Sequence, residues 1–189
     1  FYEILNEFKI MKHFKFLLIS ILIFFPLNLL GASWDHLKTK RFGNWVSYYN
    51  QYNSGSSNGR KFCTSLVSNR DGTSFSLHFF PDGAVPFLEV INKKWKIGKG
   101  DTKFSLAFKG SNCEWCNKRV ASLPGQLWGN ALTFDLVYED DQISMLAYLG
   151  ENETVEIFLD SNNASLGIFT LTGAKLAVTD MLHCLKNKN

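Results

Sequence analysis

Residues 62 to 80 read FCTSLVSNRDGTSFSLHFF, which is two short runs rich in apolar residues, separated by a turn signal at Asp71-Gly72. Short runs of this kind, bounded by turn residues, are typical of β-strands. Similar runs recur along the chain, at residues 42–49, 62–67, 74–80, 87–91, 94–97, 103–108, 131–137, 143–149, 154–159 and 166–170. Turn signals separate them, and we assign Glu139-Asp140-Asp141 to one of these turns.

This spacing predicts a mostly β fold, an antiparallel β-sandwich or barrel-like domain. Parallel β-α-β units are not favoured, because helical stretches between the runs are missing. The periodicity changes only near the C-terminus, where apolar residues from Ala174 to Leu185 recur at i, i+3 and i+4, after a possible N-cap at Thr172. We expect one C-terminal α-helix of about three turns, packed on the β-structure.

The start of the chain resembles an export signal. After Met11, Lys12 and Lys15 form a charged segment, residues 16–30 are almost wholly apolar, and residues 31–33 are small. This order is typical of a cleavable signal peptide. We therefore expect the working protein to be periplasmic or secreted.

The alternative is an uncleaved membrane anchor. A spanning helix needs about 20 apolar residues, whereas this run is shorter and is interrupted by Pro26. We therefore expect residues 1–10 to lie upstream of the native start, residues 11–33 to be the signal peptide, and residues 34–189 to form one β-rich extracytoplasmic domain without a membrane span.

The net charge of +3 is too small to predict a nucleic-acid surface. Its distribution is uneven, since residues 34–119 carry fourteen Lys or Arg and residues 120–173 carry none. This asymmetry fits a charged partner, or else two parts of the fold whose charges complement each other or are simply solvated. The second interpretation is favoured, because exposed charges contribute little to stability and vary easily.

Four cysteines, Cys63, Cys113, Cys116 and Cys184, lie in the expected exported part. An even number in an oxidising compartment predicts two disulfides, for which three pairings exist. Proximity favours Cys113 with Cys116, which leaves Cys63 with Cys184. The C-x-x-C spacing also occurs in thiol-redox proteins, but its flanks here predict a loop rather than a helix N-terminus. We expect no metal site, because zinc needs four ligands and no second close-spaced pair is present.

No catalytic residues are predicted, and no cofactor motif is present. His78 lies in an alternating run, which is typical of a surface or hydrogen-bonded core histidine. The acids Glu139, Asp140 and Asp141 are a weak candidate for a glycosidase pair or a calcium ligand set, since turns commonly carry such residues.

Two tryptophans are candidate binding residues. Trp115 and Trp128 lie in loop-like surroundings, where an exposed indole could anchor a sugar or a protein. An equally good interpretation is that they cover an edge of the β-structure.

Several motifs resemble one known family. Residues 42–46 (FGNWV) followed by residues 61–63 (KFC) resemble the opening of the invasion-associated locus B family. Residues 152–157 (NETVEI) and 166–174 (LGIFTLTGA), together with Cys184, resemble the last strands and the final helix of that family. The Cys113-x-x-Cys116 element departs from the family pattern.

The resemblance implies an exported β-sandwich-like domain, periplasmic or surface-associated, which in pathogenic members is linked to invasion of host cells. It supplies no catalytic residue. We therefore expect a non-enzymatic binding or interaction protein, whose partner is an unidentified protein or an envelope or surface ligand. The alternatives are a periplasmic thiol-redox accessory protein using Cys113 and Cys116, and a small hydrolase using the acids at residues 139–141.

Overall fold

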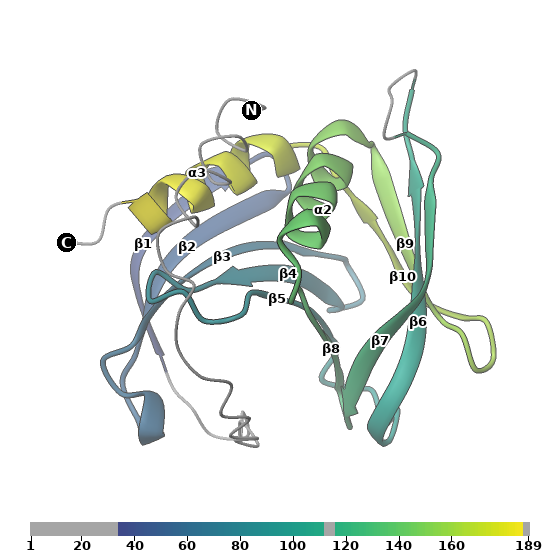
Figure 1. The fold of residues 1–189 in the computed structure, drawn as a ribbon, viewed down its shortest axis with the longest axis horizontal. Coiled ribbons are helices and arrows are strands. Elements are labelled where there is room, and N and C mark those ends of the chain that lie inside the picture. The colour runs from purple at the N-terminus through teal and green to yellow at the C-terminus, as the bar shows by residue number, and fades with distance from the viewer. Residues whose placement is uncertain (1–33, 112–115, 187–189) are drawn as a thin grey trace.

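The computed structural model describes residues 34–111 and 116–186, and Figure 1 shows their arrangement. Its strands and helices, in chain order, are β1 (Trp34–Phe42), β2 (Trp45–Tyr52), a short 3-10 helix (Gly55–Ser57), β3 (Lys61–Ser68), β4 (Ser74–Phe79), β5 (Phe87–Ile91), β6 (Lys99–Lys109), β7 (Arg119–Trp128), β8 (Ala131–Asp135), α2 (Glu139–Glu151), β9 (Thr154–Leu159), β10 (Ala164–Thr170) and α3 (Ala174–Lys186).

All ten strands belong to one sheet, in the order β1-β2-β3-β4-β5-β8-β7-β6-β9-β10, and each neighbouring pair is antiparallel. The two edge strands, β1 and β10, each contain a register shift, between His36 and Lys38 and between Ser165 and Gly167. Such bulges are one way in which sheet edges avoid pairing with other chains.

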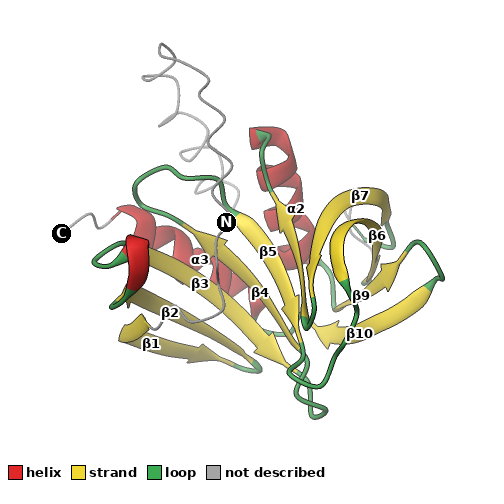
Figure 2. Ribbon diagram, turned by 90° about the horizontal axis from the view of Figure 1, so that it is seen from below, coloured by secondary structure: helices red, strands yellow, loops and turns green. Residues whose placement is uncertain are grey.

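The sheet curls over, so that β1–β5 and β6–β10 form two sides of one core, as Figure 2 shows. The Phe75 ring on β4 lies 5.5 Å from the Phe169 ring on β10. The Trp45 indole on β2 donates a hydrogen bond to the Thr170 carbonyl oxygen at 2.8 Å. Strands at opposite ends of the sheet therefore meet across a continuous apolar interior.

Both helices pack on the inner side of the curled sheet (Figure 1). The inward residues of α3 include Ala177, Val178 and Met181, all at most 1% exposed. They share one core with Trp45 and Val67 of the sheet. The predicted fold class is confirmed: the protein is mostly β and antiparallel, with a C-terminal helix packed on the sheet.

The assignment of residues 139–149 was wrong. The predicted turn at 139–141 and the predicted strand at 143–149 together form α2, so a helix does lie between strands. Its buried residues include Gln142, Met145, Leu146 and Leu149, which follow the i, i+3, i+4, i+7 spacing of one helix face. The three acids occupy the first helical turn, where negative charge is favourable.

The strand prediction failed at three further places. Residues 94–97 form a turn and an irregular segment rather than a strand. The backbone N–H of Trp95 donates a hydrogen bond to the Asn92 carbonyl oxygen at 2.9 Å. Strands β1 and β7 were not predicted. Strand β1 is mostly polar and almost wholly exposed, and β7 has no fully buried residue and contains Pro124-Gly125, a typical turn pair, so neither shows the apolar pattern by which the other strands can be recognised.

Candidate functional site

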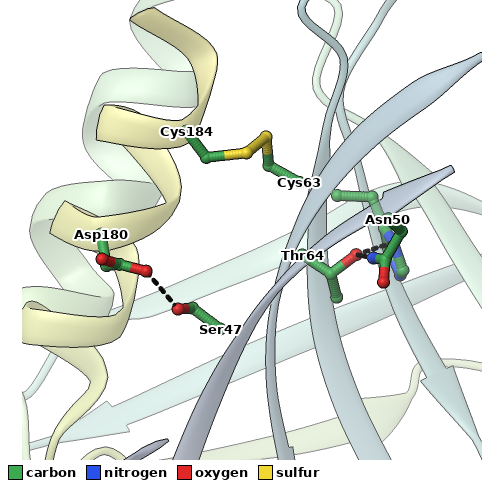
Figure 3. The surroundings of a disulfide bond; sticks show 7 residues. Ser47, Asn50, Cys63, Thr64, Asp180 and Cys184 are labelled. Atoms are coloured by element: carbon green, nitrogen blue, oxygen red, sulfur yellow. Dashed lines mark hydrogen bonds between the residues drawn. A yellow bond between two sulfur atoms is a disulfide. The ribbon is translucent and has the colours of Figure 1, made fainter. Parts of the chain in front are cut away.

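A disulfide joins α3 to the sheet. Cys184 on α3 is bonded to Cys63 on β3, with their Cα atoms 6.3 Å apart, as Figure 3 shows. Pairing Cys113 with Cys116 by proximity had left Cys63 to pair with Cys184, and this prediction is confirmed. Cys116 is also disulfide-bonded, whereas Cys113, its expected partner, lies outside the described residues.

A cavity of about 280 Å³ lies beside this disulfide, between α3 and strands β1 and β2. Its lining is mainly polar and aromatic: Lys38, Lys40, Ser47, Tyr48, Tyr49, Asp180, Met181, His183 and Cys184. Its size is near the lower end of the usual range for small-molecule pockets, about 300–1,000 Å³.

Strand and helix periodicity bring these side chains together. Lys38 and Lys40 are two residues apart on β1 and therefore point to the same face, on which they lie opposite Tyr49 and Ser47 of β2. Asp180, His183 and Cys184 are spaced i, i+3 and i+4, which places them on one side of α3. The cavity therefore has a sheet wall and a helix wall.

Asp180 connects the two walls. Its carboxylate accepts hydrogen bonds from the Lys40 ammonium and from the Ser47 hydroxyl, and Figure 3 shows the second contact. Partial burial by itself would raise the pKa of Asp180, but these hydrogen bonds and the charges of Lys40 and Lys38 outweigh it, so that the pKa lies below its ordinary value. This carboxylate therefore lies in a positive potential.

The opposite face of the sheet carries a hydrogen-bonded polar row. His36 Nδ1 lies 2.6 Å from Asn50 Oδ1, and the Asn50 amide donates to Thr64 Oγ1 at 3.2 Å. Thr64 Oγ1 lies 3.0 Å from His78 Nδ1. Asn50 and Thr64 are nearly fully buried, so each link satisfies a polar group that would otherwise be costly to bury.

His78 lies toward one end of this row, and its contacts do not resemble those of a catalytic histidine. Its Nε2 lies 2.8 Å from Ser76 Oγ and 3.7 Å from a Glu89 carboxylate oxygen, and its ring stacks on Phe87 with 4.5 Å between centroids. The hydroxyl groups on either side belong to Ser76 and Thr64, whose exposures are 1% and 4%. A buried hydroxyl cannot reach a substrate, so these contacts fit the expected hydrogen-bonded histidine.

The predicted binding residue Trp128 does not line the cavity. Trp128 lies at the end of β7, is 37% exposed, and donates its indole N–H to Thr133 Oγ1 at 3.1 Å. The sheet order separates β7 from the cavity strands β1 and β2. Trp115 lies outside the described residues.

The acids at 139–141 fall in the first turn of α2, away from the cavity lining. Over residues 34–111 and 116–186, no group of three or more His, Cys, Asp or Glu side chains is placed to hold a metal ion. Within the same ranges, no helix is both long enough and apolar enough to cross a membrane.

The fold and the cavity together define a disulfide-bonded, mostly β protein with a small polar cavity at one edge of its sheet. Comparisons of the chain with protein-family models, with curated proteins and with solved structures gave no match. The cavity is therefore the feature of the fold from which a function can be inferred, and of its lining residues sequence reasoning singled out only Cys184. The available signals were the alternation of Lys38 and Lys40 and the helical spacing of Asp180, His183 and Cys184.

Proposed function

We propose that this protein is an exported, non-enzymatic binding protein that engages a ligand at the bacterial envelope or cell surface. The cavity between α3 and β1–β2 is the observation that carries this proposal. It combines charged groups, hydroxyls and aromatic rings on two walls that the disulfide and the Asp180 contacts hold together. Concave sites with a few convergent polar groups are the usual form of ligand-binding sites.

Two observations support an extracytoplasmic location. The Cys63–Cys184 bond joins residues 121 positions apart, and structural disulfides persist mainly in oxidising compartments. The sequence of residues 11–33 predicts an export signal, and that segment lies outside the described residues. The resemblance to the invasion-associated locus B family implies the same location and a role in surface or host-cell interaction.

The alternative of a thiol-redox accessory protein has less support. Cys116 is 7% exposed, and its Sγ lies 3.5 Å from the Glu151 carbonyl oxygen at the end of α2. Thiol–disulfide exchange requires that the attacking sulfur reach the bond, so burial of Cys116 favours a structural bond. A measured reduction potential below about −300 mV would identify the bond as structural.

The binding proposal is tested by filling the cavity. His183 lines the cavity from an exposed position on α3, so His183→Trp should occupy part of its volume without disturbing the core. Leu176→Trp is the matched control, because Leu176 is also exposed on α3 but does not line the cavity. The protein and both variants are titrated by NMR with a fragment set of carboxylates, amines, amides and sugars.

We expect at least one fragment to shift the amide resonances of cavity residues in the unmodified protein and in Leu176→Trp. His183→Trp should weaken that binding about tenfold or more, which corresponds to about 1.4 kcal/mol. The proposal is wrong if no fragment shifts those resonances, or if His183→Trp and Leu176→Trp bind the fragments equally well.

A further inference from the structure

The charges around the cavity are mostly positive. Lys38 and Lys40 line it, and Asp180 is the one carboxylate among its lining residues. Lys61, on the neighbouring strand β3, holds its ammonium nitrogen 5.8 Å from the centre of the Tyr49 ring. A ligand entering this space therefore meets more cationic than anionic groups.

Asp180 is itself a carboxylate in the cavity, and its ionisation shows whether the surroundings favour negative charge. Burial opposes its ionisation, yet the hydrogen bonds from Lys40 and Ser47, with the nearby charge of Lys38, keep its pKa below the ordinary value. The potential inside the cavity therefore favours negative charge strongly enough to overcome partial desolvation.

Lys38 is the cation that remains for a ligand. Lys40 pairs with Asp180, whereas no ion pair within the described ranges joins Lys38 to a carboxylate. Lys38 lies directly opposite Tyr49 in the β1–β2 register. The sheet wall therefore places a cation beside an aromatic ring, the two groups that an aromatic acid would need.

We propose that the cavity selects an anionic ligand group, which pairs with Lys38 and packs against Tyr49. This inference rests on the proposed binding function and names its ligand class. The volume of about 280 Å³ suits a group the size of one aromatic acid, either a free small molecule or one residue or substituent of a larger partner. Charge-assisted pairing supplies the selectivity, and the aromatic ring supplies contact area.

Benzoate and benzamide are the two probes, because they have nearly the same shape and differ in charge. Each is titrated by NMR into the protein, into Lys38→Gln, into Lys38→Arg and into Lys93→Gln. Lys93 is an exposed lysine outside the cavity lining, so its variant removes the same charge elsewhere on the surface. Inorganic phosphate serves as a third probe, to separate carboxylate recognition from general anion binding.

We expect benzoate to shift the cavity resonances and to bind about tenfold or more tightly than benzamide. Lys38→Gln should remove that difference, whereas Lys38→Arg and Lys93→Gln should retain it. Phosphate binding at the same resonances, again lost in Lys38→Gln, would extend the ligand class to anions in general. If Lys38→Gln binds phosphate at these resonances as tightly as the unmodified protein does, the proposed role of Lys38 is contradicted.

The possible failures are distinguishable. If benzamide and benzoate bind the cavity equally, or if Lys38→Gln leaves the benzoate affinity unchanged, the charge inference is wrong while the binding function stands. If neither probe nor any member of the fragment set shifts the cavity resonances, the binding function fails as well. Lys38 is exposed on an edge strand, and circular dichroism of each variant verifies that the fold is retained.

Discussion

Removing the Cys63–Cys184 bond should cost a large part of the stability of this protein. The bond joins residues 121 positions apart, a separation for which the chain-entropy model gives a stabilisation of about 5 kcal/mol at 25 °C. Whole domains are stable by only about 5–15 kcal/mol. The variant with both Cys63→Ala and Cys184→Ala should therefore unfold at a much lower urea concentration, with a larger m-value because its unfolded state is less compact.

The measurement is equilibrium urea unfolding followed by tryptophan fluorescence, with the buried Trp45 as one reporter. Four samples are needed: the unmodified protein and the double variant, each with and without a reductant. The effect of the reductant on the double variant measures what the remaining cysteines contribute and is subtracted from its effect on the unmodified protein. A corrected loss below about 1.5 kcal/mol, with an unchanged m-value, would refute the loop-entropy reasoning.

Three further outcomes are expected. Gly173→Ala should lower the free energy of unfolding in urea by at least about 2 kcal/mol more than Gly98→Ala does. Both glycines have φ near +91°, but only at Gly173 would a Cβ overlap the Phe42 carbonyl oxygen. Equal losses of stability in the two variants would contradict this reasoning. Asp180→Asn should destabilise by less than about 1 kcal/mol at pH 7. Because the folded pKa of Asp180 is lowered, its contribution is fully present above the unfolded pKa of about 3.9 and is lost as the pH falls through the folded value, so the difference between the two proteins should shrink as the pH is lowered below about 3.9. A difference that stays constant as the pH is lowered would show that ionisation is not its cause. Expression from Met11 in a Gram-negative host should yield a periplasmic protein whose intact mass corresponds to a start near Ser33; a retained signal segment would contradict cleavage.

The strands that sequence reasoning found are those with a buried face. The runs at 87–91 and 154–159 coincide with β5 and β9, because both alternate between buried and partly exposed side chains. Strand β1 offers no such alternation, since it is an edge strand whose residues are nearly all exposed. The residues of β1 therefore do not indicate a strand by themselves, and β1 is a strand because it pairs with β2.

Helix α2 shows the opposite failure. A short apolar run fits a strand and a helix equally well, and the acids before it were taken for a turn. Tertiary packing decides between them, since Phe108 of β6 stacks on Tyr148 at 4.8 Å and the helix fills the interior of the curled sheet. Nothing local to residues 143–149 indicates that interior.

The cavity could not be predicted because its two walls are about 140 residues apart in sequence, as the Lys40–Asp180 pair illustrates. The sequence showed Cys184 and the helix that carries it, but not which strand face the helix would cover. That choice depends on the apolar stripe of α3 meeting Trp45 and Val67, which is a property of the whole core.

The disulfide and the ion pair have a joint consequence for binding. Asp180 and Cys184 are four residues apart on α3, and they attach this turn of the helix to β1 and to β3 respectively. The helix wall of the cavity is therefore positioned before a ligand arrives, and a ligand does not have to order it on binding. Preorganisation of this kind raises affinity by lowering the entropic cost of association. Loss of the Cys63–Cys184 bond should consequently weaken benzoate binding even at temperatures where the protein remains folded, whereas a disulfide that served stability alone would leave that affinity unchanged.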